Sequence, residues 1–261
     1  MEKVNPKKAA AIAVLAALAM QVLTWFVWYP LAGYNDTTLL IAQLAFLALG
    51  IVLFLAFKMR RQGIGLGRRE FFEAVLKILL AYAAVLLIVV ILKAAGSEIN
   101  LFRQQYNLYA FVNNWLLTGV GEELVFAGVL FTLISISAQS RRRWSAVLLT
   151  AMFFALWHLP GYLAVGIKMD SLNAGIAVDL LLNMISWGFF GTIYLFSGNL
   201  WLTAFAHAST DYALLPAVVN SPVIGLVFML ITVALAYWPW PGKRRLTMKD
   251  NKAAEEFTGL L

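Results

Sequence analysis

The stretch YAFVNNWLLTGVGEELVFAGVLFTLIS, residues 109–135, carries only two charged side chains, Glu122 and Glu123, and both lie near its middle. A helix needs about 20 mainly apolar residues to cross a bilayer, so this stretch is long enough to span one. A carboxylate at the centre of such a helix costs about 2.5–3.5 kcal/mol even on a lenient scale. We therefore predict a membrane-spanning helix whose two glutamates have a function.

The composition extends this prediction to nearly the whole chain. Of 261 residues, 62% are hydrophobic and 13% are charged, whereas soluble domains average about 45–50% and about 25%. A soluble protein is thereby excluded, and no room is left for a sizeable extramembrane domain. We predict an all-α fold, a polytopic membrane bundle of about eight transmembrane helices in one domain over residues 1–242. Spans are expected near residues 9–29, 38–58, 74–95, 109–135, 145–166, 176–196, 199–219 and 222–240.

Basic side chains between the predicted spans indicate the orientation of the bundle. Twenty Lys and Arg against 13 Asp and Glu give a net charge of +7. Most of the basic residues fall before the first span, in the second and fourth connections and after the last span. The positive-inside rule then places both termini in the cytoplasm (N-in, C-in). We attribute the charge to an anionic lipid surface rather than to nucleic acid, and we expect residues 243–261 to form a polar cytoplasmic tail.

Two further polar motifs lie inside predicted spans, and together they contain both histidines of the chain. His158 follows Phe154 by four residues, and His207 precedes Asp211 by four, which puts each pair on one helix face. Converging carboxyl and imidazole groups could supply a general base, a proton carrier and stabilisation of an oxyanion. Glu122, His158, His207 and Asp211 could equally hold a divalent metal such as zinc. The chain has no cysteine, which excludes a thiol nucleophile.

These motifs resemble those of the CPBP family, the CAAX proteases and bacteriocin-processing membrane endopeptidases. The family pattern is Glu-Glu-x-x-x-Arg, then Phe-x-x-x-His, then His-x-x-x-Asn or Asp, each on its own transmembrane helix. The corresponding residues here are Glu122 and Glu123, Phe154 and His158, and His207 and Asp211. The resemblance covers residues 109–219 in detail, and the order of the motifs agrees with the family.

The resemblance implies an intramembrane endopeptidase that acts on membrane-associated, lipidated or leader-bearing substrates. It implies Glu122 as the general base, His158 as its partner, and His207 with Asp211 on the oxyanion side. Glu123 points about 100° away from Glu122 on a helix, so we expect it to have a separate role in the site. Metal-dependent and metal-free mechanisms both fit these residues. The compact chain looks like bacterial members of the family, so we expect a bacterial cytoplasmic membrane and peptide or membrane-protein substrates.

One position departs from the family pattern. Ala127 stands where the family has an arginine, so Glu123 lacks the counter-charge expected one helical turn away. This departure leaves three hypotheses open: an active peptidase, a peptidase impaired by Ala127, and a non-catalytic relative that binds a partner, as in bacteriocin immunity or envelope regulation. A proton-coupled transporter also buries carboxyl and imidazole groups. We rank it last because the sequence shows no repeat symmetry.

Overall fold

The computed structural model describes residues 5–99, 106–137, 143–168 and 175–238, and it gives no side-chain account of residues 62 and 166–168. The predicted tail at 243–261 lies outside these ranges. The described residues form helices and connections without a strand, which confirms an all-α membrane bundle. Six helical runs are long and apolar enough to cross a membrane: Pro6–Ala32, Asp36–Ala56, Arg68–Ala94, Leu108–Ser137, Arg143–Val165 and Gly175–Ser197. They coincide with the first six predicted spans.

Two of these runs change helix type along their length. The first consists of α1 (Pro6–Leu23), η1 (Thr24–Trp28) and α2 (Tyr29–Ala32), and the fourth of α5 (Leu108–Val112), η3 (Asn113–Thr118), α6 (Gly119–Glu123), η4 (Leu124–Phe131) and α7 (Thr132–Ser137). The others are α3 (Asp36–Ala56), α4 (Arg68–Ala94), α8 (Arg143–Lys168) and α9 (Gly175–Ser197), and a short 3₁₀ turn, η2 (Gln62–Ile64), follows α3. In η1, η3 and η4 the hydrogen bonds span five residues instead of four, an arrangement that is common near functional sites.

The last two predicted spans are shorter than expected. The segment at 199–219 forms α10 (Leu200–Asp211) and α11 (Ala217–Asn220), and the segment at 222–240 forms α12 (Pro222–Tyr237). A helix of 12 residues such as α10 rises only about 18 Å, against about 30 Å of hydrocarbon. Most of α10 is buried in protein, which is where interrupted helices are tolerated at membrane depth. The number of eight spans therefore stays a prediction.

Hydrogen bonds to other helices hold both ends of α10. At its start, Asn199 accepts a hydrogen bond from the Leu202 amide at 3.1 Å and donates one to the Glu70 carbonyl at 2.8 Å. At its end, the Trp115 indole donates to the Tyr212 carbonyl at 2.9 Å. The helix that carries the third motif is thus held between α4 and η3.

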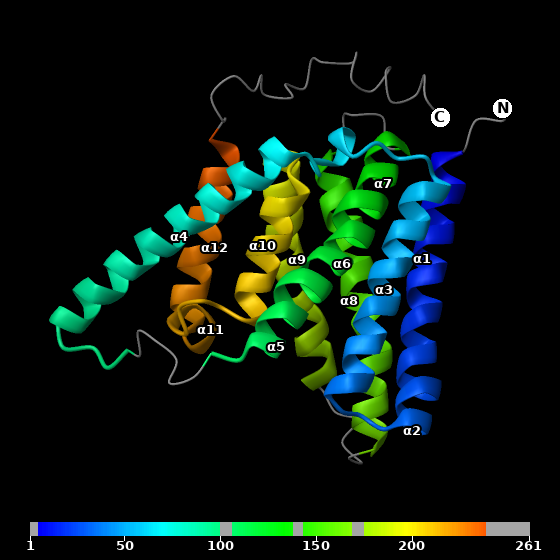
Figure 1. Cartoon of the computed structure of the whole chain (residues 1–261), viewed down its shortest axis with the longest axis horizontal. Helices are drawn as coiled ribbons and strands as arrows, with labels where there is room; N and C mark the ends of the chain where they lie inside the picture. The colour runs from blue at the N-terminus through cyan, green and yellow to red at the C-terminus, as the bar shows by residue number, and fades with distance from the viewer. Residues whose placement is uncertain (1–4, 100–105, 138–142, 169–174, 239–261) are drawn as a thin grey trace.

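Figure 1 shows how the elements are arranged. Helices α1 and α3 pack together on one flank, α4 and α12 pack together on the other, and α6, α8, α9 and α10 lie between them. One end of the bundle contains the starts of α1, α4 and α8 and the ends of α3, α7 and α12. The basic connections adjoin these ends. Which end faces the cytoplasm stays a prediction.

Candidate active site

The two adjacent glutamates occupy the end of α6, in the middle of the bundle. Both side chains are buried, and Glu123 has no exposed surface. A close approach between helices brings them to α10, because a Cβ on Gly119 would lie 2.8 Å from the Ala204 carbonyl oxygen and 3.1 Å from the Ala208 Cβ. Only glycine lets α6 lie this near to α10, one helical turn before Glu123.

Glu123 is hydrogen-bonded to His207 across this contact. The Glu123 Oε1 and His207 Nδ1 atoms are 2.9 Å apart, and within the described residues the second oxygen, Oε2, has no hydrogen-bond partner. The His207 ring stacks on Phe190, with centroids 4.6 Å apart and planes at 22°, and meets Phe154 edge-on at 5.8 Å. The imidazole is therefore fixed in both position and orientation.

The other nitrogen of His207 faces two more carboxyl groups. Its Nε2 lies 3.6 Å from Asp211 Oδ2 and 3.9 Å from Glu122 Oε2, distances of ion pairs rather than of hydrogen bonds. The Asp211 side chain is 34% exposed, whereas the Glu122 side chain is buried. The structure thus places the carboxyl groups of three predicted site residues around the imidazole of a fourth, His207.

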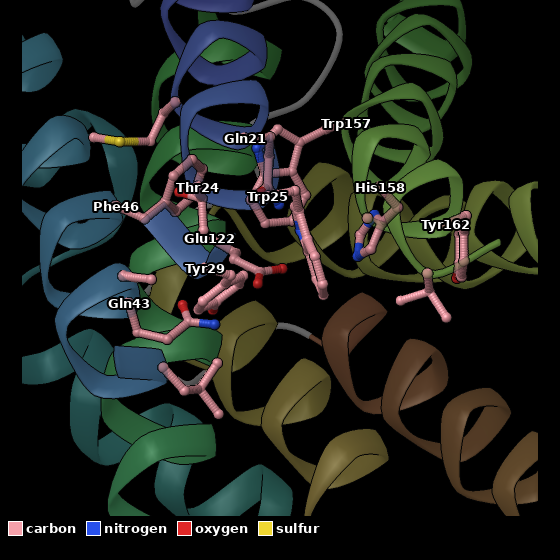
Figure 2. Close-up of a pocket in the computed structure, with 15 residues that line it drawn as sticks. Gln21, Thr24, Trp25, Tyr29, Gln43, Phe46, Glu122, Trp157, His158 and Tyr162 are labelled. Atoms are coloured by element: carbon pink, nitrogen blue, oxygen red, sulfur yellow. The ribbon is translucent and has the colours of Figure 1, made fainter. Parts of the chain in front are cut away.

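His158 joins the site through a cavity. Glu122 and His158 both line a cavity of about 390 Å³, and Figure 2 shows both side chains at its wall. The His158 Nδ1 atom lies 2.8 Å from the Phe154 carbonyl oxygen. A carbonyl only accepts hydrogen bonds, so Nδ1 carries the hydrogen and Nε2 of the neutral ring can accept a proton. Neither His207 nor Asp211 is among the described residues that line this cavity.

The opposite wall contains residues that the sequence analysis missed. They come from α1, η1, α2 and α3 and include Gln21, Thr24, Trp25, Tyr29 and Gln43. A signal was present, since Gln21 and Gln43 are isolated carboxamides within the first two predicted spans. On the side of α8, Tyr162 lines the cavity, and its hydroxyl accepts a hydrogen bond of 2.7 Å from the Asn183 amide.

The arrangement does not fit a metal held by the predicted ligands Glu122, His158, His207 and Asp211. A catalytic zinc site uses three protein ligands, and no group of three or more His, Cys, Asp or Glu side chains in the described ranges is placed to hold a metal ion. His207 Nδ1 is already bound to Glu123, and His158 faces the cavity from another helix.

Residues 104–213 match the family model for type II CAAX prenyl endopeptidase Rce1-like proteins. The chain carries an Rce1-like domain. The match includes all five predicted site residues and confirms the resemblance to the CPBP family. No curated protein and no solved structure matched the chain. A domain from a peptidase family thus lies in a polytopic membrane protein.

The Rce1-like domain supplies only part of the cavity. Glu122, Trp157, His158 and Tyr162 come from the matched residues, but the wall formed by α1, η1, α2 and α3 precedes them in the chain. The catalytic candidates therefore belong to the family domain, and the facing wall belongs to the N-terminal helices.

The contact at Gly119 leads to a first prediction. We expect Gly119→Val to lower peptide cleavage at least about tenfold, because the larger side chain pushes α6 from α10 and separates Glu123 from His207. Gly188→Val is the matched control, since a Cβ on Gly188 meets nothing within 4 Å. Equal activity of the two variants would contradict the prediction.

Proposed function

We propose that this protein is an intramembrane endopeptidase in which Glu122 activates water against a peptide bond in the cavity. The observation that carries the proposal is a buried carboxyl group at the wall of a cavity inside the bundle, with an imidazole on the same wall. The substrates we expect are apolar or lipidated segments of membrane-associated peptides and proteins, because the cavity lies among membrane-spanning helices.

The reaction needs a group that takes a proton and later returns one. Glu122 removes a proton from water while the water oxygen attacks the carbonyl carbon. The proton then passes to the amide nitrogen as the carbon–nitrogen bond breaks, which leaves a carboxylic acid and an amine. His158 can take part in this transfer, because its Nε2 is free to accept a proton in the same cavity.

Glu123 and His207 have a supporting role in this proposal. The Glu123 carboxyl group holds His207 Nδ1, and the stacked Phe190 fixes the ring, so Nε2 stays directed toward Glu122 and Asp211. A positive charge on this ring would stabilise negative charge that develops beside Glu122. The oxyanion role of His207 and Asp211 stays a prediction from the family resemblance.

The hydrogen bond between Glu123 and His207 also bears on Ala127. His207 is a partner for Glu123 in the role that the family pattern gives to arginine. The alanine at 127 therefore does not leave the Glu123 carboxyl group without a partner. This contact favours an active peptidase over the partner-binding alternative. Ala127 is itself fully buried, so an arginine there would have to displace packed neighbours.

Hydrolysis in ¹⁸O-labelled water tests the proposal. The purified protein in liposomes is incubated with peptides of about 20 residues that have an apolar centre and lysine flanks. We expect mass spectrometry to find ¹⁸O at the new carboxyl terminus, with Glu122→Gln as the inactive control. Ala127→Arg, measured in parallel, should show no gain in activity. Absence of cleavage from the parent with cleavage by Ala127→Arg would mean an impaired enzyme, and absence from both would favour partner binding.

A further inference from the structure

Three polar side chains of the N-terminal wall face the cavity. Gln21, Thr24 and Gln43 are half-buried and line the same cavity as Glu122. Within the described ranges, none of their side chains makes a hydrogen bond. Figure 2 shows the Gln43 carboxamide and the Glu122 carboxylate at the same cavity, from different helices.

An unpaired carboxamide at this depth needs an explanation. Gln21 lies within an alanine- and leucine-rich stretch of α1, and Gln43 within a similarly apolar stretch of α3. A ligand that covered these half-buried amides without bonding them would lose roughly 1–3 kcal/mol for each on protein mutational scales. Two such groups on adjacent helices, both directed at one cavity, indicate that the cavity takes a ligand with matching donors and acceptors.

A peptide substrate has this requirement at the bond to be cut. A helical segment keeps its amides bonded internally, so the scissile carbonyl becomes accessible only when the segment unwinds. In the hydrocarbon region no bulk water is present to satisfy the freed N–H and C=O groups. A carboxamide has two donor hydrogens and one acceptor oxygen. It can donate to a peptide C=O group and accept from a peptide N–H group.

We propose that Gln21 and Gln43 bind the main chain of an unwound, extended, apolar peptide segment on either side of the scissile bond, with the Thr24 hydroxyl as an additional partner. This inference rests on the proposed peptidase function and adds to it the way in which the substrate is held. Recognition by main-chain amides makes cleavage tolerant of substrate side chains and sensitive to changes in the substrate backbone. The contact places the carbonyl against Glu122, so Gln21 and Gln43 are positioning residues.

Backbone-modified substrates test the inference. The best-cleaved peptide from the liposome assay is compared with analogues that carry one N-methylated amide or one ester bond within three residues of the cut. We expect the parent protein to lose about tenfold in kcat/KM on at least one analogue, as for one lost hydrogen bond. Gln43→Leu or Gln21→Leu should lose a similar factor on the unmodified peptide. The variant that has lost the partner of the modified amide should show no further loss on that analogue.

A control variant separates a lost hydrogen bond from a changed cavity shape. Leu39 lines the cavity and carries no polar group, so Leu39→Met should keep the full tenfold difference between the peptide and its analogue. The same peptide with a dansyl label can also be bound to the Glu122→Gln variant, with and without Gln43→Leu. Its affinity then measures the lost hydrogen bond without turnover. The parent could cleave the peptide and lose the same factor in kcat/KM on each analogue as both glutamine variants do. That result would overturn this inference alone. Neither cleavage nor binding by the parent would overturn the peptidase function as well.

Discussion

Glu122→Gln is expected to lower kcat for peptide hydrolysis by about 10²- to 10⁴-fold, the usual contribution of a general base. Glutamine keeps the shape of the side chain but cannot take a proton from water. The Glu122 carboxyl group is 3.9 Å from His207 Nε2, beyond hydrogen-bond distance, so the substitution removes no short contact. We therefore expect KM and the free energy of unfolding to change little. Steady-state cleavage in liposomes and reversible unfolding in mixed micelles measure the two effects.

The matched control for this substitution is Asp179→Asn. It also exchanges a carboxyl group for an amide in a membrane-spanning helix, but Asp179 is exposed on α9 and does not line the described cavity. We expect it to retain full activity. If Glu122→Gln cleaved peptides at the parent rate, water would be activated by another group and the proposed mechanism would be wrong.

The fold was largely predictable from the sequence because the bilayer imposes a simple pattern. A hydrocarbon thickness of about 30 Å requires long apolar runs, and six of the predicted spans are present as such helices. The prediction was less accurate for residues 199–219, where hydropathy cannot distinguish a helix in lipid from one buried in protein. The α10 helix ends at Asp211 because the following residues are held by Trp115 and other side chains, a contact distant in sequence.

The grouping of the candidate residues was predictable where single residues carried the signal. Charged or imidazole side chains inside apolar spans made Glu122, Glu123, His158, His207 and Asp211 the candidates, and the structure brings three of these carboxyl groups to the ring of His207. Spacing along one helix pointed to residue 127 as the partner position of Glu123. Its partner in the structure is on α10, 84 residues away. Pairing between helices of this kind depends on the close contact at Gly119 and cannot be inferred from spacing.

The buried pair of Glu123 and His207 gives the second large effect, on stability as well as activity. His207→Leu would leave both oxygens of a fully buried carboxyl group without a partner. Removal of one member of a buried pair costs about 3–5 kcal/mol. Glu123→Leu leaves an imidazole that still faces Glu122 and Asp211, so we expect a smaller loss of about 1–3 kcal/mol. Unfolding in mixed micelles measures both losses.

The double variant separates the structural role of this pair from its catalytic role. With leucine at both positions no buried carboxyl group is left unpaired at 123, so we expect the double variant to be more stable than His207→Leu alone. Its peptidase activity should stay lost, because leucine at position 207 has no nitrogen to face Glu122. Glu73 and Lys77, a buried pair on α4 at 2.8 Å, serve as the control: their leucine variants should show comparable coupling in stability and retain cleavage per folded molecule. Recovery of activity in the Glu123 and His207 double variant would reduce this pair to a structural contact.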